Sequence, residues 1–191
     1  MRKAFGSISK DELMRVYRES NLEIVLPLNE EFRFGDCPAY RTLSGANLKE
    51  MDFGWWDTAK NTLWLMEVKD YSRLTLEERL PVDLFDTFVN KATDSLMMLA
   101  SVWFSSAQGT SISACLPTSC RSFPFHPHKI KLVFLLKVNS HTIPEIETLR
   151  DRLKNRLKGR VALFNMAVTN VILLDHNTAM SVGLPIRAIS P

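Results

Sequence analysis

The sequence is short of cysteine, of charge of one sign and of long hydrophobic runs. Its 3 cysteines in 191 residues do not make the disulfide framework of a small secreted domain. Lys and Arg number 24 against 21 Asp and Glu, so the net charge of +3 neither requires nor excludes nucleic acid as a partner. No apolar run is long enough to cross a bilayer, and none follows Met1-Arg2-Lys3 as in a secretory signal. We therefore expect a cytoplasmic protein without a membrane partner.

The rest of the composition is that of a globular protein. Hydrophobic residues make up 46% of the chain and charged residues 24%. A chain of 191 residues has room for one domain with a sizeable core, whereas two full domains would be cramped. The sequence has no internal repeat, Gly-rich phosphate loop or dinucleotide fingerprint. We predict a single α/β domain over residues 1–191.

Hydrophobic periodicity predicts the order of the elements. Ser9, followed by Asp11 and Glu12, is typical of a helix start, and this helix would end near Asn21 or Leu22. In chain order we expect a helix over 9–22, a hairpin over 50–70, a helix over 83–106, a strand over 130–138, a helix over 144–159 and a strand over 168–174. This order indicates a mixed β-sheet core with helices on both faces.

The stretch from Glu50 to Asp70 is read as a hairpin because two alternating segments flank a polar turn. Successive side chains of a strand point to opposite faces. One face is apolar and is predicted to be core, with Met51, Phe53 and Trp55 on the first strand and Trp64, Met66 and Val68 on the second. The other face carries Glu50, Asp52 and Gly54 on the first strand and Leu65, Glu67 and Lys69 on the second.

The register of the hairpin decides which charged side chains meet. If the turn is centred between Ala59 and Lys60, Asp52 lies directly opposite Glu67. A shift of two residues places Asp52 opposite Lys69 instead. A shift of one residue would bury the charges and expose tryptophans, so the hydrophobic pattern excludes it. Both allowed registers keep Asp52, Glu67 and Lys69 on one face.

Two carboxylates on opposed positions repel each other unless a cation lies between them, because their Cβ atoms are only about 4.5–5.5 Å apart. Mg²⁺ (or Mn²⁺) prefers oxygen ligands, commonly one or two carboxylates with water and substrate phosphate. Asp52 and Glu67 are therefore candidate metal ligands, and Lys69 a candidate to orient or deprotonate a water. The competing interpretation is a solvated face with a cross-strand salt bridge. Leu63 and Leu65 share that face and argue that it is covered.

The pattern Asp52 … Glu67-Val68-Lys69 resembles the motif of the PD-(D/E)XK nuclease superfamily, which includes restriction-endonuclease-like enzymes and Holliday junction resolvases. That motif has an acid on one strand and Glu-x-Lys on the next, within a helix–sheet–helix core. The resemblance implies metal binding by Asp52 and Glu67, and assistance to the attacking water by Lys69. Met51 departs from the pattern, because a proline often precedes the first acid.

The resemblance also indicates accessory residues. The superfamily often adds a glutamate from its first helix, for which Glu12 and Glu19 are the candidates. Several nuclease-like families have a basic or amide residue on the helix after Glu-x-Lys, and Lys91 lies on that helix within a wide apolar arc. The alternative for Lys91, which the sequence favours, is an i,i+3 salt bridge to Asp94.

A second basic cluster lies on the helix over 144–159. Arg150, Lys154 and Lys158 form one column there and are weak candidates for phosphate contacts. Acidic residues dilute the column, so a solvated helix face is the favoured interpretation.

The segment over 107–129 is rich in Ser, Thr, Pro and Gly and is expected to be a long loop. It carries Cys115, Cys120, His126 and His128, which are residue types that bind zinc. The two histidines are too close for the usual finger spacing, so incidental residues are the favoured interpretation.

Taken together, the residues predict a Mg²⁺- or Mn²⁺-dependent nuclease that cleaves nucleic acid, with DNA favoured over RNA. The alternative is a catalytically silent nuclease fold that binds nucleic acid or protein within a larger system. A homodimer is expected only by analogy with nuclease-like enzymes that cut duplexes as dimers.

Overall fold

The computed structural model describes residues 14–124 and 129–189, which form a mixed α/β fold with two β-sheets and, in these ranges, five α-helices. The strands are β1 (Met14–Glu19), β2 (Leu22–Pro27), β3 (Glu31–Phe32), β4 (Phe53–Asp57), β5 (Thr62–Asp70), β6 (Ile130–Lys137), β7 (Val171–Asp175) and β8 (Ile186–Ala188). The helices are α1 (Pro38–Ser44), α2 (Leu84–Trp103), α3 (Ala107–Ser113), α4 (Ile143–Ala162) and α5 (His176–Ser181). Short 3-10 turns lie at Phe34–Asp36, Thr118–Cys120, Ser140–Thr142 and Val168–Asn170.

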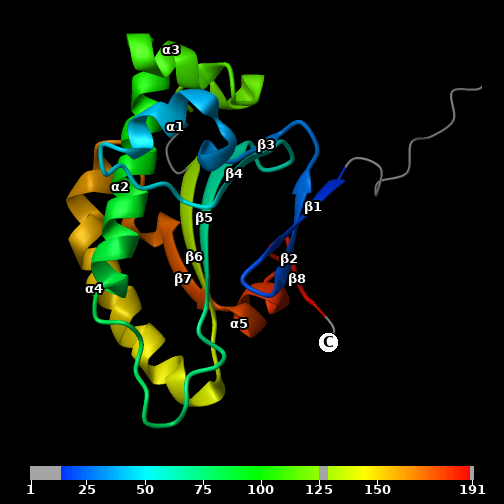
Figure 1. Ribbon diagram of the computed structural model, residues 1–191, viewed down its shortest axis with the longest axis vertical. Helices are drawn as coiled ribbons and strands as arrows, with labels where there is room; N and C mark the ends of the chain where they lie inside the picture. The colour runs from blue at the N-terminus through cyan, green and yellow to red at the C-terminus, as the bar shows by residue number, and fades with distance from the viewer. Residues whose placement is uncertain (1–13, 125–128, 190–191) are drawn as a thin grey trace, which may run out of the picture.

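The larger sheet has the strand order β3-β4-β5-β6-β7 and is mixed. Strands β3, β4 and β5 pair antiparallel, whereas β5, β6 and β7 pair parallel, with α2 and α4 in the two crossovers. Figure 1 shows α2 and α4 on one face of this sheet and the smaller sheet, of order β1-β2-β8, on the other. No helix of the described ranges has the length and apolar character to cross a membrane.

The central strands are buried on both faces, so their side chains feed two cores. Alternate residues of β5 and β6, such as Leu65 and Phe134, pack against α2 and α4. The intervening residues, such as Met66 and Val133, pack against β2, β8 and α5. The expected apolar stripe of α4 is confirmed, because Ile146, Leu149, Leu153 and Leu157 are all buried.

The predicted register of the β4–β5 hairpin is confirmed. Phe53 pairs with Met66 and Asp57 with Thr62, which is the register centred between Ala59 and Lys60. One residue departs from the prediction. Met51 packs in the helix-side core, not with Phe53, because the chain bends at Asp52, before β4 begins.

The predicted helix over 9–22 is wrong where the structure describes it. Residues 14–19 and 22–27 form the β1–β2 hairpin, which reverses at Ser20 and Asn21 with φ of 52° and 56°. Positive φ at both central residues is the geometry of a tight two-residue hairpin turn. The apolar spacing of Val16 and Tyr17 fitted a helix, but a segment of six residues satisfies either period.

Two further expectations need correction. The second face of the larger sheet is covered by the three-stranded sheet and the short helix α5, not by long helices. The long loop over 107–129 contains α3 and the 3-10 turn Thr118–Cys120. Helix α3 lies so close to α2 that a Cβ on Gly109 would come within 1.9 Å of the Ser101 carbonyl oxygen. This close approach requires glycine, which explains how a Gly-containing, loop-like sequence packs as a helix.

Candidate functional site

Asp52 is fixed at the point where the chain enters β4. The backbone N–H of Met51 donates to Ser95 Oγ on α2 at 2.9 Å, and Arg33 Nε donates to the carbonyl oxygen of Asp52 at 3.2 Å. The Val68 N–H donates to Asp52 Oδ2 at 2.8 Å. Val68 lies beyond the last β4–β5 pair, so the Asp52 carboxylate satisfies an amide that has no partner on β4. The other carboxylate oxygen, Oδ1, is left to face Glu67 and α2.

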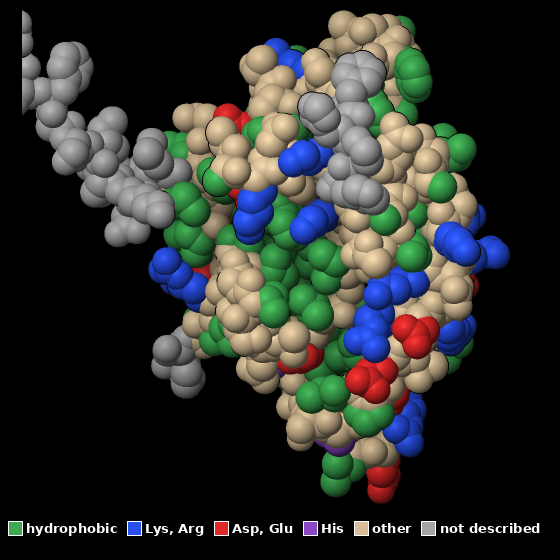
Figure 2. Space-filling view, turned by 180° about the vertical axis from the view of Figure 1, so that it is seen from behind, with side chains coloured by type: hydrophobic (Ala, Val, Ile, Leu, Met, Phe, Trp, Pro, Cys, Tyr) green, Lys and Arg blue, Asp and Glu red, His purple; other side chains and the backbone are tan. Residues whose placement is uncertain are grey.

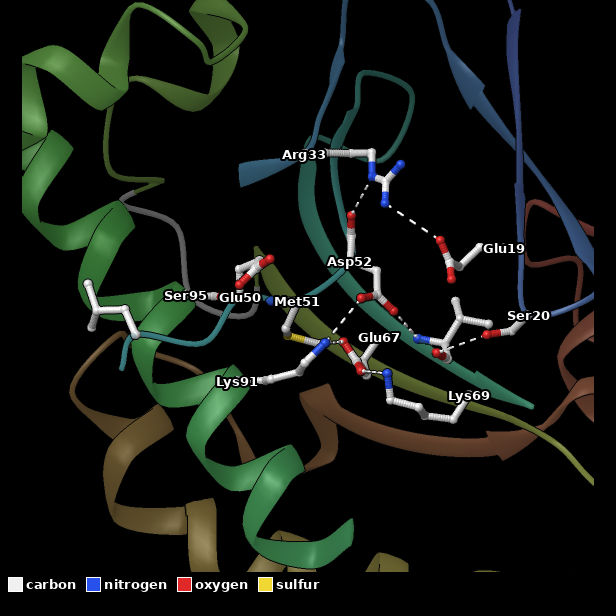
Figure 3. Close-up of polar contacts among 12 residues, drawn as sticks. Glu19, Ser20, Arg33, Glu50, Met51, Asp52, Glu67, Lys69, Lys91 and Ser95 are labelled. Atoms are coloured by element: carbon white, nitrogen blue, oxygen red, sulfur yellow. Dashed lines mark hydrogen bonds and ion pairs between the residues drawn. The ribbon is translucent and has the colours of Figure 1, made fainter. Parts of the chain in front are cut away.

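Glu67 projects from β5 toward α2 and has a relative exposure of 0%. Its Oε2 lies 2.7 Å from Lys91 Nζ, and its Oε1 lies 2.7 Å from Lys69 Nζ. Lys91 Nζ also lies 3.1 Å from Asp52 Oδ1. The two carboxylates therefore converge on one ammonium, with the second lysine beside them (Figure 3).

Burial and like charge make Glu67 unusual. Its pKa is raised to about 7, first because burial disfavours the carboxylate and then because the Asp52 carboxylate is close; Lys91 and Lys69 oppose the shift. Burial alone would lower the pKa of Lys69, but the carboxylates of Glu67, Asp52 and Glu19 outweigh it and raise that pKa. The cluster thus keeps the charge of Lys69 beside a carboxyl group whose pKa is close to neutral pH.

The donor set fits a hard divalent cation. Asp52 Oδ1 and Glu67 Oε2 already surround a positive charge, the Lys91 ammonium, at 3.1 Å and 2.7 Å. Two carboxylates completed by water and substrate oxygens are a common set for Mg²⁺. Within residues 14–124 and 129–189, no group of three or more His, Cys, Asp and Glu side chains is disposed to hold a metal ion. Water and substrate would therefore have to supply the remaining ligands.

The predicted site residues come together to different degrees. Asp52, Glu67 and Lys69 form one cluster, and Lys91 joins it. The favoured interpretation of Lys91 is wrong: it contacts the two carboxylates, and Asp94 instead accepts the backbone N–H of Lys49 at 2.9 Å. A solvated hairpin face is also wrong, because Glu67 is fully buried.

The two candidate accessory glutamates, Glu12 and Glu19, have different outcomes. Glu12 lies outside the described residues. Glu19 lies on strand β1, not on a helix, where its charge acts on Lys69 and its Oε2 lies 3.5 Å from Arg33 Nη2. Sequence patterns missed Arg33 altogether. The one signal was the alternation Phe32-Arg33-Phe34, which is too short to place a strand or to name its neighbours.

The basic column of α4 remains apart from this cluster. Arg150 and Lys154 are half-buried and Lys158 is exposed, and Arg150 Nε lies 3.7 Å from Asp151. Figure 2 shows Lys and Arg side chains mixed with Asp and Glu side chains on the flank that carries α4. The role of this column in nucleic-acid binding stays a prediction.

One of the four residues considered as zinc ligands, Cys115, is paired with another cysteine. Cys115, at the end of α3, forms a disulfide with Cys37, which precedes α1. Cys120 is free and buried. His126 and His128 lie outside the described residues. Because Cys115 is paired with Cys37, its sulfur does not serve as a thiolate ligand in this structure.

Comparisons of this chain with models of protein families, with curated proteins and with solved structures give no match. The resemblance to the PD-(D/E)XK superfamily consequently depends on the motif residues and their geometry.

Proposed function

We propose that this chain is a divalent-metal-dependent nuclease with a restriction-endonuclease-like core, acting on nucleic acid and first of all on DNA. One observation carries the proposal. The carboxylates of Asp52 and Glu67 converge on a single cation position, and Lys69 lies on the same strand two residues after Glu67. Metal-assisted phosphodiester hydrolysis can use such an arrangement: ligands for a hard cation next to a group that orients a water or stabilises a developing negative charge.

Energetics support a functional reason for the cluster. A buried ion pair gives little net stability, because removing the charges from water costs about as much as their attraction returns. A fully buried glutamate with a pKa raised to about 7 is therefore poor evidence of a device for stability. Strongly shifted groups in contact with a specific charged partner are instead typical of functional sites.

In the proposed reaction, a water oxygen attacks phosphorus and the bond from phosphorus to the leaving sugar oxygen breaks. The attacking water loses a proton and the leaving oxygen gains one, so the products are a phosphomonoester and an alcohol. A bound Mg²⁺ would lower the pKa of a water and neutralise charge on the phosphate. Asp52 and Glu67 would hold the ion, and Lys69 would stabilise the negative charge that develops beside it.

A second candidate is a catalytically silent subunit that binds nucleic acid or protein. The observation that favours it is the position of Lys91, whose ammonium forms ion pairs with both carboxylates without a metal ion. In a silent protein this lysine would be a permanent replacement for the metal. In a nuclease it would give way to the ion.

Cleavage of labelled single-stranded and duplex DNA and RNA with Mg²⁺ or Mn²⁺ tests the proposal. Wild type would be compared with Glu67→Gln and Lys69→Met, and with Glu145→Gln as a control. Glu145 is an acid that pairs with Arg79, remote from the cluster. We expect metal-dependent cutting that only the first two substitutions abolish, and Mn²⁺ binding that Glu67→Gln weakens. The absence of both Mn²⁺ binding and cutting would refute the nuclease and favour the silent subunit.

A further inference from the structure

Arg33 lies next to the carboxylate pair, although it belongs to none of the motifs in the sequence. It follows β3, and its Nε donates to the carbonyl oxygen of Asp52 at 3.2 Å. Figure 3 shows Arg33 and Lys91 approaching Asp52 from different sides, with the guanidinium of Arg33 directed toward the space between Asp52 and Glu19. A single hydrogen bond therefore connects this arginine to a proposed metal ligand.

Two aromatic rings hold the guanidinium in place. Its Cζ lies 4.9 Å from the centre of the Phe53 ring and 5.8 Å from the centre of the Tyr17 ring. These rings contact each other, with centroids 5.3 Å apart. A cation–π contact is an attraction between the positive charge and the ring faces, and it needs no hydrogen-bond acceptor. The two rings thus position the arginine and supply no acceptor atom for its donors.

The donors of Arg33 are incompletely used by the protein. Among contacts with the described residues, its terminal nitrogens make one ion pair, 3.5 Å from Nη2 to Glu19 Oε2. That distance exceeds the roughly 2.7–2.9 Å of a charge-assisted hydrogen bond. The Arg33 side chain is 32% exposed, so a ligand in solution reaches it. A preorganised guanidinium with spare donors and a weakly held carboxylate is suited to exchange that carboxylate for another anion.

We infer that Arg33 forms an anion subsite that binds a non-bridging phosphate oxygen of a nucleic-acid backbone, and that Glu19 occupies its donors when no nucleic acid is bound. The identity of the anion rests on the proposed nuclease function, because a guanidinium fork matches carboxylate as well as phosphate. Arg33 is hydrogen-bonded to Asp52, a member of the carboxylate pair. The bound phosphate would therefore be at or beside the bond to be cut.

A purely structural role for Arg33 makes a different forecast. An arginine that only anchors the Asp52 carbonyl would lower stability when replaced, and replacement of Glu19 would not improve binding of any ligand. If Arg33 forms an anion subsite, Glu19→Gln should improve ligand binding, because it removes the carboxylate that competes for the donors of Arg33. Glu19→Gln is therefore the variant that separates the two roles.

The experiment measures binding of labelled single-stranded and duplex DNA by fluorescence anisotropy, once in EDTA and once in Ca²⁺, a hard cation with oxygen ligands. The variants are Arg33→Gln, Arg33→Lys and Glu19→Gln. Arg18→Gln is the matched control, since Arg18 lies next to Glu19, is 75% exposed and pairs with Glu23. Thermal unfolding would confirm that each variant is folded.

We expect Arg33→Gln to weaken binding about 10- to 100-fold, the usual effect of losing a hydrogen bond to a charged group. Arg33→Lys keeps the charge but loses the fork, so it should fall between Arg33→Gln and wild type. Glu19→Gln should tighten binding, and Arg18→Gln should change it less than threefold. Equal weakening by Arg18→Gln and Arg33→Gln, unchanged or weaker binding by Glu19→Gln, or no binding by wild type in either buffer would overturn the subsite.

Failure of the subsite is distinguishable from failure of the nuclease. Metal-dependent cutting with a KM that Arg33→Lys leaves unchanged would refute the subsite alone. DNA binding that depends on Arg33, without cutting and without Mn²⁺ binding, would refute the nuclease alone.

Discussion

The Nζ atom of Lys91 lies 2.7 Å from Glu67 Oε2 and also contacts Asp52, so it occupies the position between two carboxylates that a divalent cation would take. A lysine in this position reduces the repulsion between the two carboxylates when no metal ion is bound. It would also compete with the proposed metal ion, because both cannot occupy the space between the same oxygens.

Replacing Lys91 with methionine should therefore have opposite effects on stability and on metal affinity. Breaking a buried ion pair costs about 3–5 kcal/mol when the remaining charge is left uncompensated. Here Lys69 still pairs with Glu67, so Asp52 is the carboxylate that loses its ion-pair partner. In EDTA we expect Lys91→Met to lower the free energy of unfolding by that order, whereas added Mn²⁺ should restore much of the loss and bind more tightly than to wild type. Thermal unfolding with and without Mn²⁺ measures both effects. The same loss in both buffers would show that no ion replaces the lysine, and Lys158→Met, an exposed position on α4, is the control.

The raised pKa of Glu67 predicts a pH dependence with a definite sign. Its pKa is about 7 in the folded chain and 4.5 ordinarily, so the folded state holds the proton more tightly than the unfolded state. This contribution to stability is complete below pH 4.5 and is lost as the pH rises through 7. Without metal, wild type should lose on the order of 3 kcal/mol relative to Glu67→Gln across that window. Urea denaturation at several pH values measures the difference, and a constant difference would contradict the shift.

The cysteines should give three distinct thiol counts. Burial raises the pKa of the Cys120 thiol to about 12, and the thiolate is the reactive form, so native protein should not react with a thiol reagent at pH 8. Denaturation without a reductant should expose one thiol, and reduction should expose all 3. Mass spectrometry after labelling gives the count. Three labelled thiols in denatured, unreduced protein would show that Cys37 and Cys115 are not paired in solution.

Gly54 should tolerate no side chain, because Phe32 lies across it. A Cβ at Gly54 would come within 2.2 Å of the Phe32 ring. Gly54→Ala should destabilise the fold by about 1–3 kcal/mol, the cost of overpacking, and disturb the β3–β4 pairing next to Asp52. Gly159→Ala is the control, since a Cβ there meets nothing within 4 Å and alanine favours a helix. Thermal unfolding compares the two, and equal stability would contradict the clash.

The parts of the site that the sequence predicted are those that depend on local geometry. The period of two predicted that Asp52 and Glu67 share a face in either allowed register, and the turn centred between Ala59 and Lys60 is the one that the structure has. Helical periodicity placed Lys91 on α2, but its partners lie 39 and 24 residues away along the chain, so the sequence wrongly favoured the local carboxylate of Asp94.

The parts that the sequence did not predict depend on long-range pairing. Strand β3 has only two residues and is defined by its pairing with β4. No local sequence pattern therefore predicts that Arg33 lies beside Asp52. The β1–β2 hairpin was missed because its turn residues, Ser20 and Asn21, lack the glycine that usually marks a tight turn. Because Glu19 lies on this hairpin, its position near Arg33 and Lys69 was not predicted either.

The smaller sheet connects the position of Glu19 to a strand far along the chain. Glu19 lies near one end of the chain on β1, while β2 pairs on its other edge with β8, which ends at residue 188. The tip of that hairpin is fastened to β5 by Asn21, whose Nδ2 donates to Asp70 at 2.6 Å. The position of Glu19 beside Arg33 therefore depends on strand pairing between segments that lie far apart along the chain. A substitution in β8 that weakens its pairing with β2 would act on the site through the hairpin that carries Glu19.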